Sequence, residues 1–210
     1  MKLAWGAKVS SEFVDKILEI GRRFGWGIAL INALMAVIAF ESARTFKPDI
    51  KNLVGSGAVG LIQFTTAGLA HLNQVRAGKG LSRLSLDDLA AMTAVDQLEQ
   101  VALYFEPYAS RIKTLSDVYM AVLAPSAVGD PENTPLYSEG LRYDLNSKLD
   151  LDGDHIITKA EASSFIVSRL SQGLQYGYYS EVELGPDPAE VLRDAIALLK
   201  QGLAKLEEVA

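Results

Sequence analysis

The chain has 210 residues, no cysteine and a formal net charge of −6 at pH 7. With 49% hydrophobic and 22% charged residues, it has the composition of a folded globular protein and not of a disordered one. The lack of cysteine excludes disulfides, thiolate nucleophiles and zinc–thiolate sites, and the lack of a basic patch argues against a nucleic-acid partner. This length fits one large domain or one domain with an appendage.

The first half of the chain reads as helical. Ser10 or Ser11 caps a helix that ends near Gly25. The next run, residues 27–40, is 14 residues long and almost wholly apolar. Because a transmembrane helix needs about 20 residues, we interpret the run as a buried core helix and expect no stable membrane insertion. This helix places Glu41 at its C-terminal end, where burial raises a carboxyl pKa and suits a general acid.

A glycine-rich turn follows this glutamate. Gly55, Gly57 and Gly60 allow a tight reversal of the chain and a close backbone approach. Gln63 then stands where its amide could bind a polar ligand, or equally serve as a helix cap or a surface residue. Glu41 itself has an ordinary alternative, because a glutamate at a helix end is often a solvated surface residue.

Three more helices are expected before residue 125. They span about residues 66–73, residues 85 to 106 and residues 115–123, and Pro107 and Pro125 end the last two. No stretch in this half alternates with period two for long, so we expect little or no sheet. The predicted fold class is therefore mainly α.

Residues 150–161 fit the twelve-residue calcium loop of an EF-hand. Such loops supply carboxylates, one backbone carbonyl and one hydroxyl to Ca²⁺, which prefers six to eight oxygen ligands. The expected ligands here are Asp150, Asp152, Asp154, the carbonyl of Ile156, Thr158 and Glu161. An acidic surface loop with solvated charges is the alternative.

One position departs from this pattern. His155 stands where glycine is expected for a left-handed turn, which costs on the order of 1 kcal/mol and predicts weaker binding than in a high-affinity buffer. Helices are expected on both sides, near residues 137–143 and 160–170. Since the sequence contains only one such loop, we interpret the loop as a structural calcium site and not as a calcium sensor. Residues 131–210 carry 7 basic and 14 acidic side chains, so calcium would offset self-repulsion there.

A last helix is expected from Asp187, with an apolar face that packs onto the body or, alternatively, forms an exposed partner-binding stripe. We therefore divide the chain into two parts. Residues 1–130 are expected to form the catalytic domain, and residues 131–210 the calcium loop with C-terminal helices packed on that domain.

Three segments resemble a known family. Glu41-Ser42, residues 46–48 (Phe-Lys-Pro) and residues 57–63 (Gly-Ala-Val-Gly-Leu-Ile-Gln) resemble the ordered signature "ES…FNP…GAxGLMQ" of the soluble lytic transglycosylase and goose-type lysozyme superfamily. The resemblance implies a lysozyme-like α-helical domain with Glu41 as the single catalytic acid/base. It also implies that Ser42, Gln63 and Phe64 support substrate binding.

The resemblance is incomplete at residues 123–129. The family has an Ala-Tyr-Asn-Ala-Gly element there, whereas this chain reads Leu-Ala-Pro-Ser-Ala-Val-Gly. Ser126 or the nearby Tyr119 is the candidate replacement as a substrate contact, and the alternative for Tyr119 is a core aromatic. No second catalytic carboxylate can be assigned, and Asp49, Asp96 and Asp117 are candidates only because they are present.

By resemblance, the expected activity is cleavage of the β-1,4 bond between N-acetylmuramic acid and N-acetylglucosamine in peptidoglycan, with either an anhydro or a reducing-end product. The N-terminal residues lack the apolar core of a secretory signal. The combination resembles calcium-stabilised bacteriophage cell-wall enzymes, lytic transglycosylases or endolysins, that reach the periplasm or cell wall after release or on a virion. We expect a monomer acting on glycan strands. The alternative is a calcium-dependent peptidoglycan-binding or interaction protein without cleavage activity.

Overall fold

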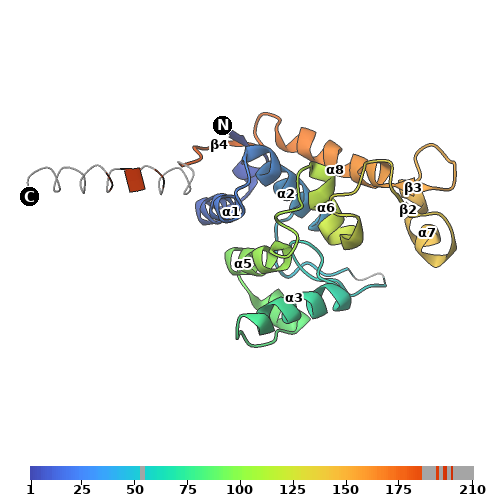
Figure 1. Cartoon of the computed structure of the whole chain (residues 1–210), viewed down its shortest axis with the longest axis horizontal. Coiled ribbons are helices and arrows are strands. Elements are labelled where there is room, and N and C mark those ends of the chain that lie inside the picture. Colours follow the sequence, from blue (N-terminus) through green and yellow to red (C-terminus); the bar gives the residue numbers. More distant parts are fainter. Residues whose placement is uncertain (53–54, 186–192, 194–195, 198–199, 201–210) are drawn as a thin grey trace, which may run out of the picture.

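The computed structural model describes residues 1–52 and 55–185, together with residues 193, 196, 197 and 200. Within them the protein is mainly helical, as expected from the sequence (Figure 1). The α-helices are α1 (Ser11–Phe24), α2 (Ile28–Glu41), α3 (Thr66–Gly78), α4 (Leu86–Ala91), α5 (Ala94–Phe105), α6 (Leu115–Leu123), α7 (Gly140–Asn146) and α8 (Lys159–Gly173). The helix expected from Asp187 lies outside the described residues.

In the described residues the strands are short and form two antiparallel pairs. β1 (Lys2–Leu3) pairs with β4 (Ser180–Glu181), and β2 (Pro135–Tyr137) pairs with β3 (Ile157–Thr158). This agrees with the expectation of little sheet. In the part of the chain that the structure describes, every helix is too short or too polar to cross a membrane.

The core is built around α2. All residues from 31 to 39 are buried, and α1, α6, α8 and β1 pack against the helix. The helix before α2 is bounded by local interactions. The Ser10 hydroxyl caps the start of α1 by accepting the N–H of Phe13 at 3.3 Å, and Gly25 ends α1 at φ +65°. The uniformly apolar sequence of α2 is thus explained by contacts on all of its sides.

The single helix expected from Ser85 is divided in two. Met92 is extended at ψ 158°, and Thr93 restarts the helix by accepting the N–H of Asp96 at 3.1 Å. Both Ser85 and Thr93 therefore act as N-caps. The apolar periodicity continues across the break, which is why it suggested one helix.

Helix α8 connects the acidic loop at residues 150–161 to the core. Lys159, its first residue, is 1% exposed, and its Nζ lies 2.5 Å from Asp117 Oδ1 at the start of α6. The same ammonium group donates to the carbonyl of Asp130 at 2.7 Å. Figure 1 shows α8 running from this point over the core, with β2, β3 and α7 gathered at one end of the molecule.

The N-terminal residues are also held by α8 and the segment after it. The Trp5 indole Nε1 donates to the carbonyl of Arg169 at 3.0 Å, and the Trp5 backbone N–H donates to Gly173 at 3.1 Å. A Cβ at Gly173 would lie 2.4 Å from the Trp5 ring, so only glycine permits this contact. Figure 1 shows the N-terminus beside β4.

Candidate active site and acidic loop

Glu41 is the last residue of α2 and is partly buried. Burial alone raises the pKa of its carboxyl group to about 7, and no charged side chain of the described residues contributes. At neutral pH the group is therefore divided between its acid and its carboxylate form. A carboxyl group in this state can donate a proton and later accept one.

Two tyrosines stand beside Glu41. Burial raises the pKa of both Tyr104 and Tyr119, and the nearby charge of Glu41 raises each of them further. The Tyr104 hydroxyl donates to the carbonyl of Ala121 at 2.9 Å, while the Tyr119 ring packs against Phe40 with 5.9 Å between centroids. Helices α5 and α6 thus meet at the end of α2. The sequence pattern singles out Tyr119, whereas it indicates only an apolar helix face for Tyr104.

The glycine turn is fixed to α5 by a buried amide. The Gln97 Oε1 accepts the N–H of Leu61 at 2.7 Å, and its Nε2 donates to Pro48 at 3.0 Å and to Leu89 at 2.7 Å. Gly60 adopts φ +85°, and a Cβ there would lie 2.3 Å from Gln97. Glycine is therefore required at this position for both conformation and space.

Gln63 and Phe64 lie close to Tyr104. The Gln63 Nε2 donates to the carbonyls of Gly60 at 3.1 Å and Ile50 at 3.3 Å. Phe64 is buried, with its ring 5.7 Å from that of Tyr104. A small hollow of about 30 Å³ is lined by Ile62, Gln63, Phe64, Thr65, Gly68, Tyr104 and Val122. The Gln63 amide nitrogen thus holds the turn, and its side chain lines the hollow.

The two serines singled out in the sequence differ in exposure. Ser42 is fully buried, and its hydroxyl accepts the N–H of Phe46 at 3.1 Å, which holds the turn after α2. Ser126 is exposed in the short 3-10 turn Pro125–Ala127. Phe165 of α8 is an exposed aromatic residue. Its ring lies 6.4 Å from that of Phe40.

Two of the three candidate second carboxylates, Asp96 and Asp117, make contacts that stabilise the fold. Asp96 caps α5 through Thr93. Burial would raise the pKa of Asp117, but hydrogen bonds from Lys159 and from backbone N–H groups lower it. Asp49 is exposed. None of the three contributes to the raised pKa of Glu41.

A second, larger hollow of about 680 Å³ lies between α1, α3 and α5, away from Tyr104. Arg23 pairs with Glu99 at 2.7 Å and Lys79 with Glu106 at 2.7 Å along its walls. Its charged groups are mainly engaged with one another. It does not include Glu41 or its aromatic neighbours.

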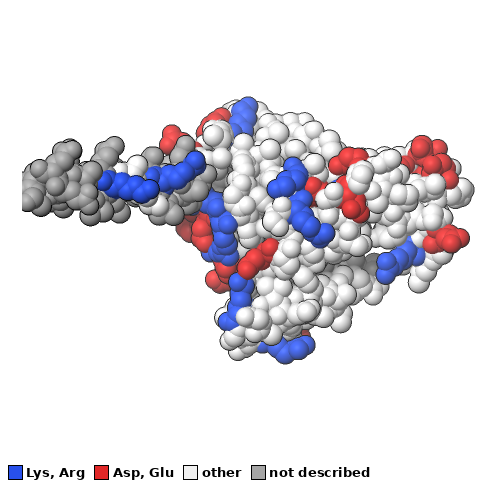
Figure 2. All heavy atoms as spheres, viewed as in Figure 1, with Lys and Arg blue, Asp and Glu red and all other residues white. Residues whose placement is uncertain are grey.

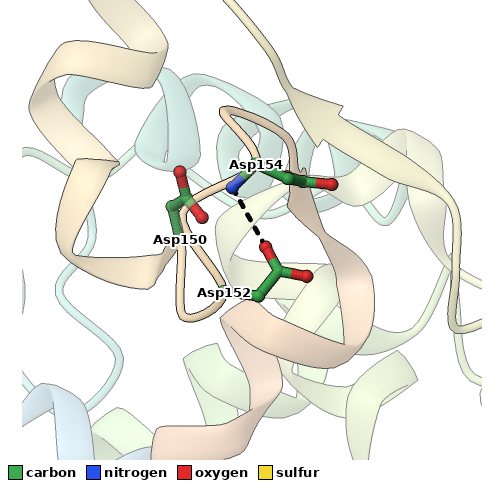
Figure 3. A group of neighbouring side chains, drawn as sticks. All are labelled: Asp150, Asp152 and Asp154. Atoms are coloured by element: carbon green, nitrogen blue, oxygen red, sulfur yellow. Dashed lines mark hydrogen bonds between the residues drawn. The ribbon is translucent and has the colours of Figure 1, made fainter.

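The acidic loop brings three aspartates together, as Figure 3 shows. Oxygen atoms of Asp150, Asp152 and Asp154 all lie within 4.8 Å of one another. Asp154 donates its backbone N–H to Asp152 Oδ1 at 3.2 Å, and Asp150 Oδ1 accepts from Gly153 at 2.7 Å. Figure 2 shows acidic side chains gathered at this end of the molecule. The donor set consists of hard carboxylate oxygens, which suits a cation such as Ca²⁺.

Glu161 and His155 complete the loop geometry. The Glu161 carboxylate accepts the N–H of Leu151 at 3.0 Å and that of Thr158 at 2.8 Å, so it joins the two ends of the loop. His155 adopts φ +67°, which is the left-handed conformation that the sequence pattern requires at this position. Tyr143 of α7 donates to Asp150 Oδ2 at 2.6 Å. Helices flank the loop on both sides as α7 and α8, but α7 spans Gly140–Asn146 and not residues 137–143, because Tyr137 belongs to strand β2.

The comparisons with known proteins assign no family to these features. No family profile matches the sequence, and no curated protein or solved structure shows significant similarity to it.

Proposed function

We propose that this protein is a peptidoglycan-cleaving enzyme with a lysozyme-like catalytic domain, in which Glu41 is the catalytic acid/base. The observation that carries the proposal is the state of Glu41: burial raises its pKa to about 7, and its charge raises the pKa of two buried tyrosines, Tyr104 and Tyr119. The resemblance of the segments around Glu41, Gly60 and Gln63 to the lytic transglycosylase signature supplies the substrate class.

The chemistry needs one proton donor at the bridging oxygen. Protonated Glu41 donates its proton to that oxygen as the bond to the muramic acid C1 breaks, and positive charge develops on the sugar ring. The carboxylate left on Glu41 then accepts the proton of the incoming hydroxyl as it attacks C1. Burial of the carboxyl group keeps its pKa high before the reaction.

The resemblance to the lytic transglycosylases implies attack by the substrate's own C6 hydroxyl. Glycosidases that use water or a covalent intermediate generally need a second carboxylate near the bond. Two of the candidates, Asp96 and Asp117, are held in the fold by Thr93 and Lys159. We therefore propose a lytic transglycosylase, which forms a 1,6-anhydromuramic acid end, with hydrolysis as the alternative outcome.

Calcium is proposed as a structural ion. The ligands would be Asp150, Asp152, Asp154, the carbonyl of Ile156, Thr158 and Glu161, of which the three aspartates already converge. Bound calcium would neutralise this acidic group and supply no chemistry to the glycan. The residues of the loop fit such an ion because they offer only oxygen donors.

The alternative is a calcium-dependent peptidoglycan-binding protein that does not cleave. It draws on the altered segment at residues 123–129, which forms the Pro125–Ala127 turn in place of the family's Tyr-Asn pair. The buried carboxyl group of Glu41 favours the enzyme, because pure binding does not need a carboxyl group with a pKa of about 7.

The decisive experiment is mass spectrometry of muropeptides released from purified peptidoglycan. We expect anhydro-muramyl ends from the wild type, and a rate about 10²–10⁴-fold lower from Glu41→Gln. Glu106→Gln is the matched control, because Glu106 is also at a helix end but is exposed and pairs with Lys79. Reducing ends would reassign the protein to the hydrolases. Binding of peptidoglycan without any release would support the alternative.

A further inference from the structure

Arg76, in the last turn of α3, is a buried cation that is only 9% exposed. Its Nε donates to the carbonyl of Ser82 at 2.8 Å, and its Nη1 donates to Gln100 Oε1 at 2.6 Å. Both acceptors are uncharged, and none of the ion pairs between described residues includes Arg76. Because a buried charge without a counter-charge is costly, this position favours an anion.

Arg76 lines the hollow of about 680 Å³ where α5 lies between α1 and α3 (Figure 1). A guanidinium group carries N–H donors on each of its nitrogens and binds a carboxylate through two parallel hydrogen bonds. The contacts to Ser82 and Gln100 engage Nε and Nη1, whereas Nη2 makes no hydrogen bond with a described residue. Arg76 therefore keeps donors available for an anionic group in the hollow.

The charges along the hollow leave a single cation over. Its basic side chains are Arg23, Arg76 and Lys79, and its acidic ones are Glu99 and Glu106. Arg23 pairs with Glu99 at 2.7 Å and Lys79 with Glu106 at 2.7 Å, so Arg76 remains without an acidic partner. A monoanion would neutralise this lining, whereas a doubly charged anion such as phosphate would reverse its sign.

The hollow also has an apolar wall. Phe24 of α1, Leu81 and Leu103 of α5 complete the lining, and Leu81 is 43% exposed. The volume of the hollow lies within the range of about 300–1,000 Å³ that small-molecule sites have. Such sites combine apolar contacts with a few polar groups that fix the orientation of the ligand. One cation beside an apolar wall fits an organic acid with an apolar body.

We propose that this hollow is a binding site for a small organic carboxylate. Arg76 binds the carboxylate group, and Phe24, Leu81 and Leu103 contact the apolar body of the ligand. Glu41 does not line the hollow. The site is therefore additional to the proposed catalytic site, and it stands whether or not the protein cleaves peptidoglycan.

The test is an NMR titration of the labelled full chain with hexanoate, 1-hexanol and inorganic phosphate as separate probes. Hexanoate should bind with a Kd of about 1 mM and shift the signals of Phe24, Leu81 and Leu103. 1-Hexanol has the same chain without the charge and should bind at least about tenfold more weakly, because it loses the charged hydrogen bonds. Phosphate should also bind more weakly than hexanoate.

Arg76→Gln should weaken hexanoate binding by at least about tenfold, because it removes the charge. Arg83→Gln is the matched control: Arg83 is exposed and does not line the hollow, so this variant should bind as the wild type does. A folded Arg76→Gln variant with unchanged affinity would overturn the proposal.

The wild-type titrations decide the question even where Arg76→Gln does not fold. Equal affinity for hexanoate and 1-hexanol would reduce the site to an apolar hollow, and tighter binding of phosphate would contradict a carboxylate site. Hexanoate shifts that do not saturate, or that spare Phe24, Leu81 and Leu103, would also overturn the proposal. Saturable shifts at these residues, with hexanoate preferred over both other probes, are the expected result.

Discussion

The end of α2 and the acidic loop use carboxyl groups in opposite ways. At Glu41, burial raises the pKa to about 7, without a charged neighbour among the described residues. In the loop, hydrogen bonds lower the pKa of Asp150, chiefly from Tyr143, and that of Glu161, chiefly from the backbone of Thr158. The same functional group is thus divided between its acid and anionic forms near neutral pH in one region and kept anionic in the other. Hydration and hydrogen bonding determine which form is favoured.

The strongest test of how the two regions are joined is Lys159→Met. The variant leaves Asp117 as a buried carboxylate without its cation, so we expect the free energy of unfolding to fall by about 3–5 kcal/mol. Urea unfolding followed by circular dichroism measures this loss. Lys113→Met, at an exposed lysine near the same aspartate, should stay within about 0.5 kcal/mol of the wild type. Equal losses in the two variants would mean that the buried pair does not join the regions.

Calcium should stabilise the acidic loop and with it the whole fold. At a free concentration one hundred times the Kd, a single ion bound only to the folded state adds about 2.7 kcal/mol to the free energy of unfolding. Thermal unfolding with calcium and with chelator measures the gain, which Asp152→Ala should abolish. Asp144→Ala removes an exposed acid just outside the loop and should keep the gain. A gain of the same size in Asp152→Ala would place the ion elsewhere.

Glu41→Gln should stabilise the protein at high pH. The pKa of Glu41 in the folded protein, about 7, exceeds its value in the unfolded chain. Ionisation of Glu41 therefore opposes folding. This destabilising effect is absent below about pH 4.5 and complete above about pH 7. The free energy of unfolding of Glu41→Gln relative to the wild type should rise by about 3 kcal/mol across this range. Denaturant titrations at pH 4, 6 and 8 check the slope, and a flat difference would contradict the burial of the charge.

The smallest expected effect comes from Tyr104→Phe. Loss of the hydroxyl removes the hydrogen bond to Ala121 and should lower the free energy of unfolding by about 1 kcal/mol. The ring remains, so the pKa of Glu41, read from its NMR titration, should change little. A large fall in that pKa would show that the hydroxyl, and not the aromatic ring, keeps water from the carboxyl group.

The helices and the local motifs could be predicted from the sequence. α6 spans Leu115–Leu123 as expected, because a threonine cap and Pro125 bound an apolar run. The end of α2 at Glu41 and the left-handed conformation of His155 also follow from local patterns. In each case the determining interactions lie within a few residues of the position concerned.

Contacts between distant segments could not be predicted in this way. Tyr104 reads as an ordinary apolar helix position, and only the packing of α5 against α6 brings it near Glu41. The pair formed by Lys159 and Asp117 spans 42 positions of the sequence. Each of these side chains is unremarkable where it occurs in the chain. Their roles arise from tertiary structure alone.

The contacts of Trp5 set an order for folding during synthesis. The partners of this residue, Arg169 and Gly173, leave the ribosome more than 160 residues later, and β1 must wait for Ser180–Glu181. Non-local contacts of this kind form slowly, since a long loop has to close first. A nascent chain that contains Glu41 therefore still lacks the helix that covers α2. The core around Glu41 is therefore complete only after the residues of α8 and β4 have been synthesised.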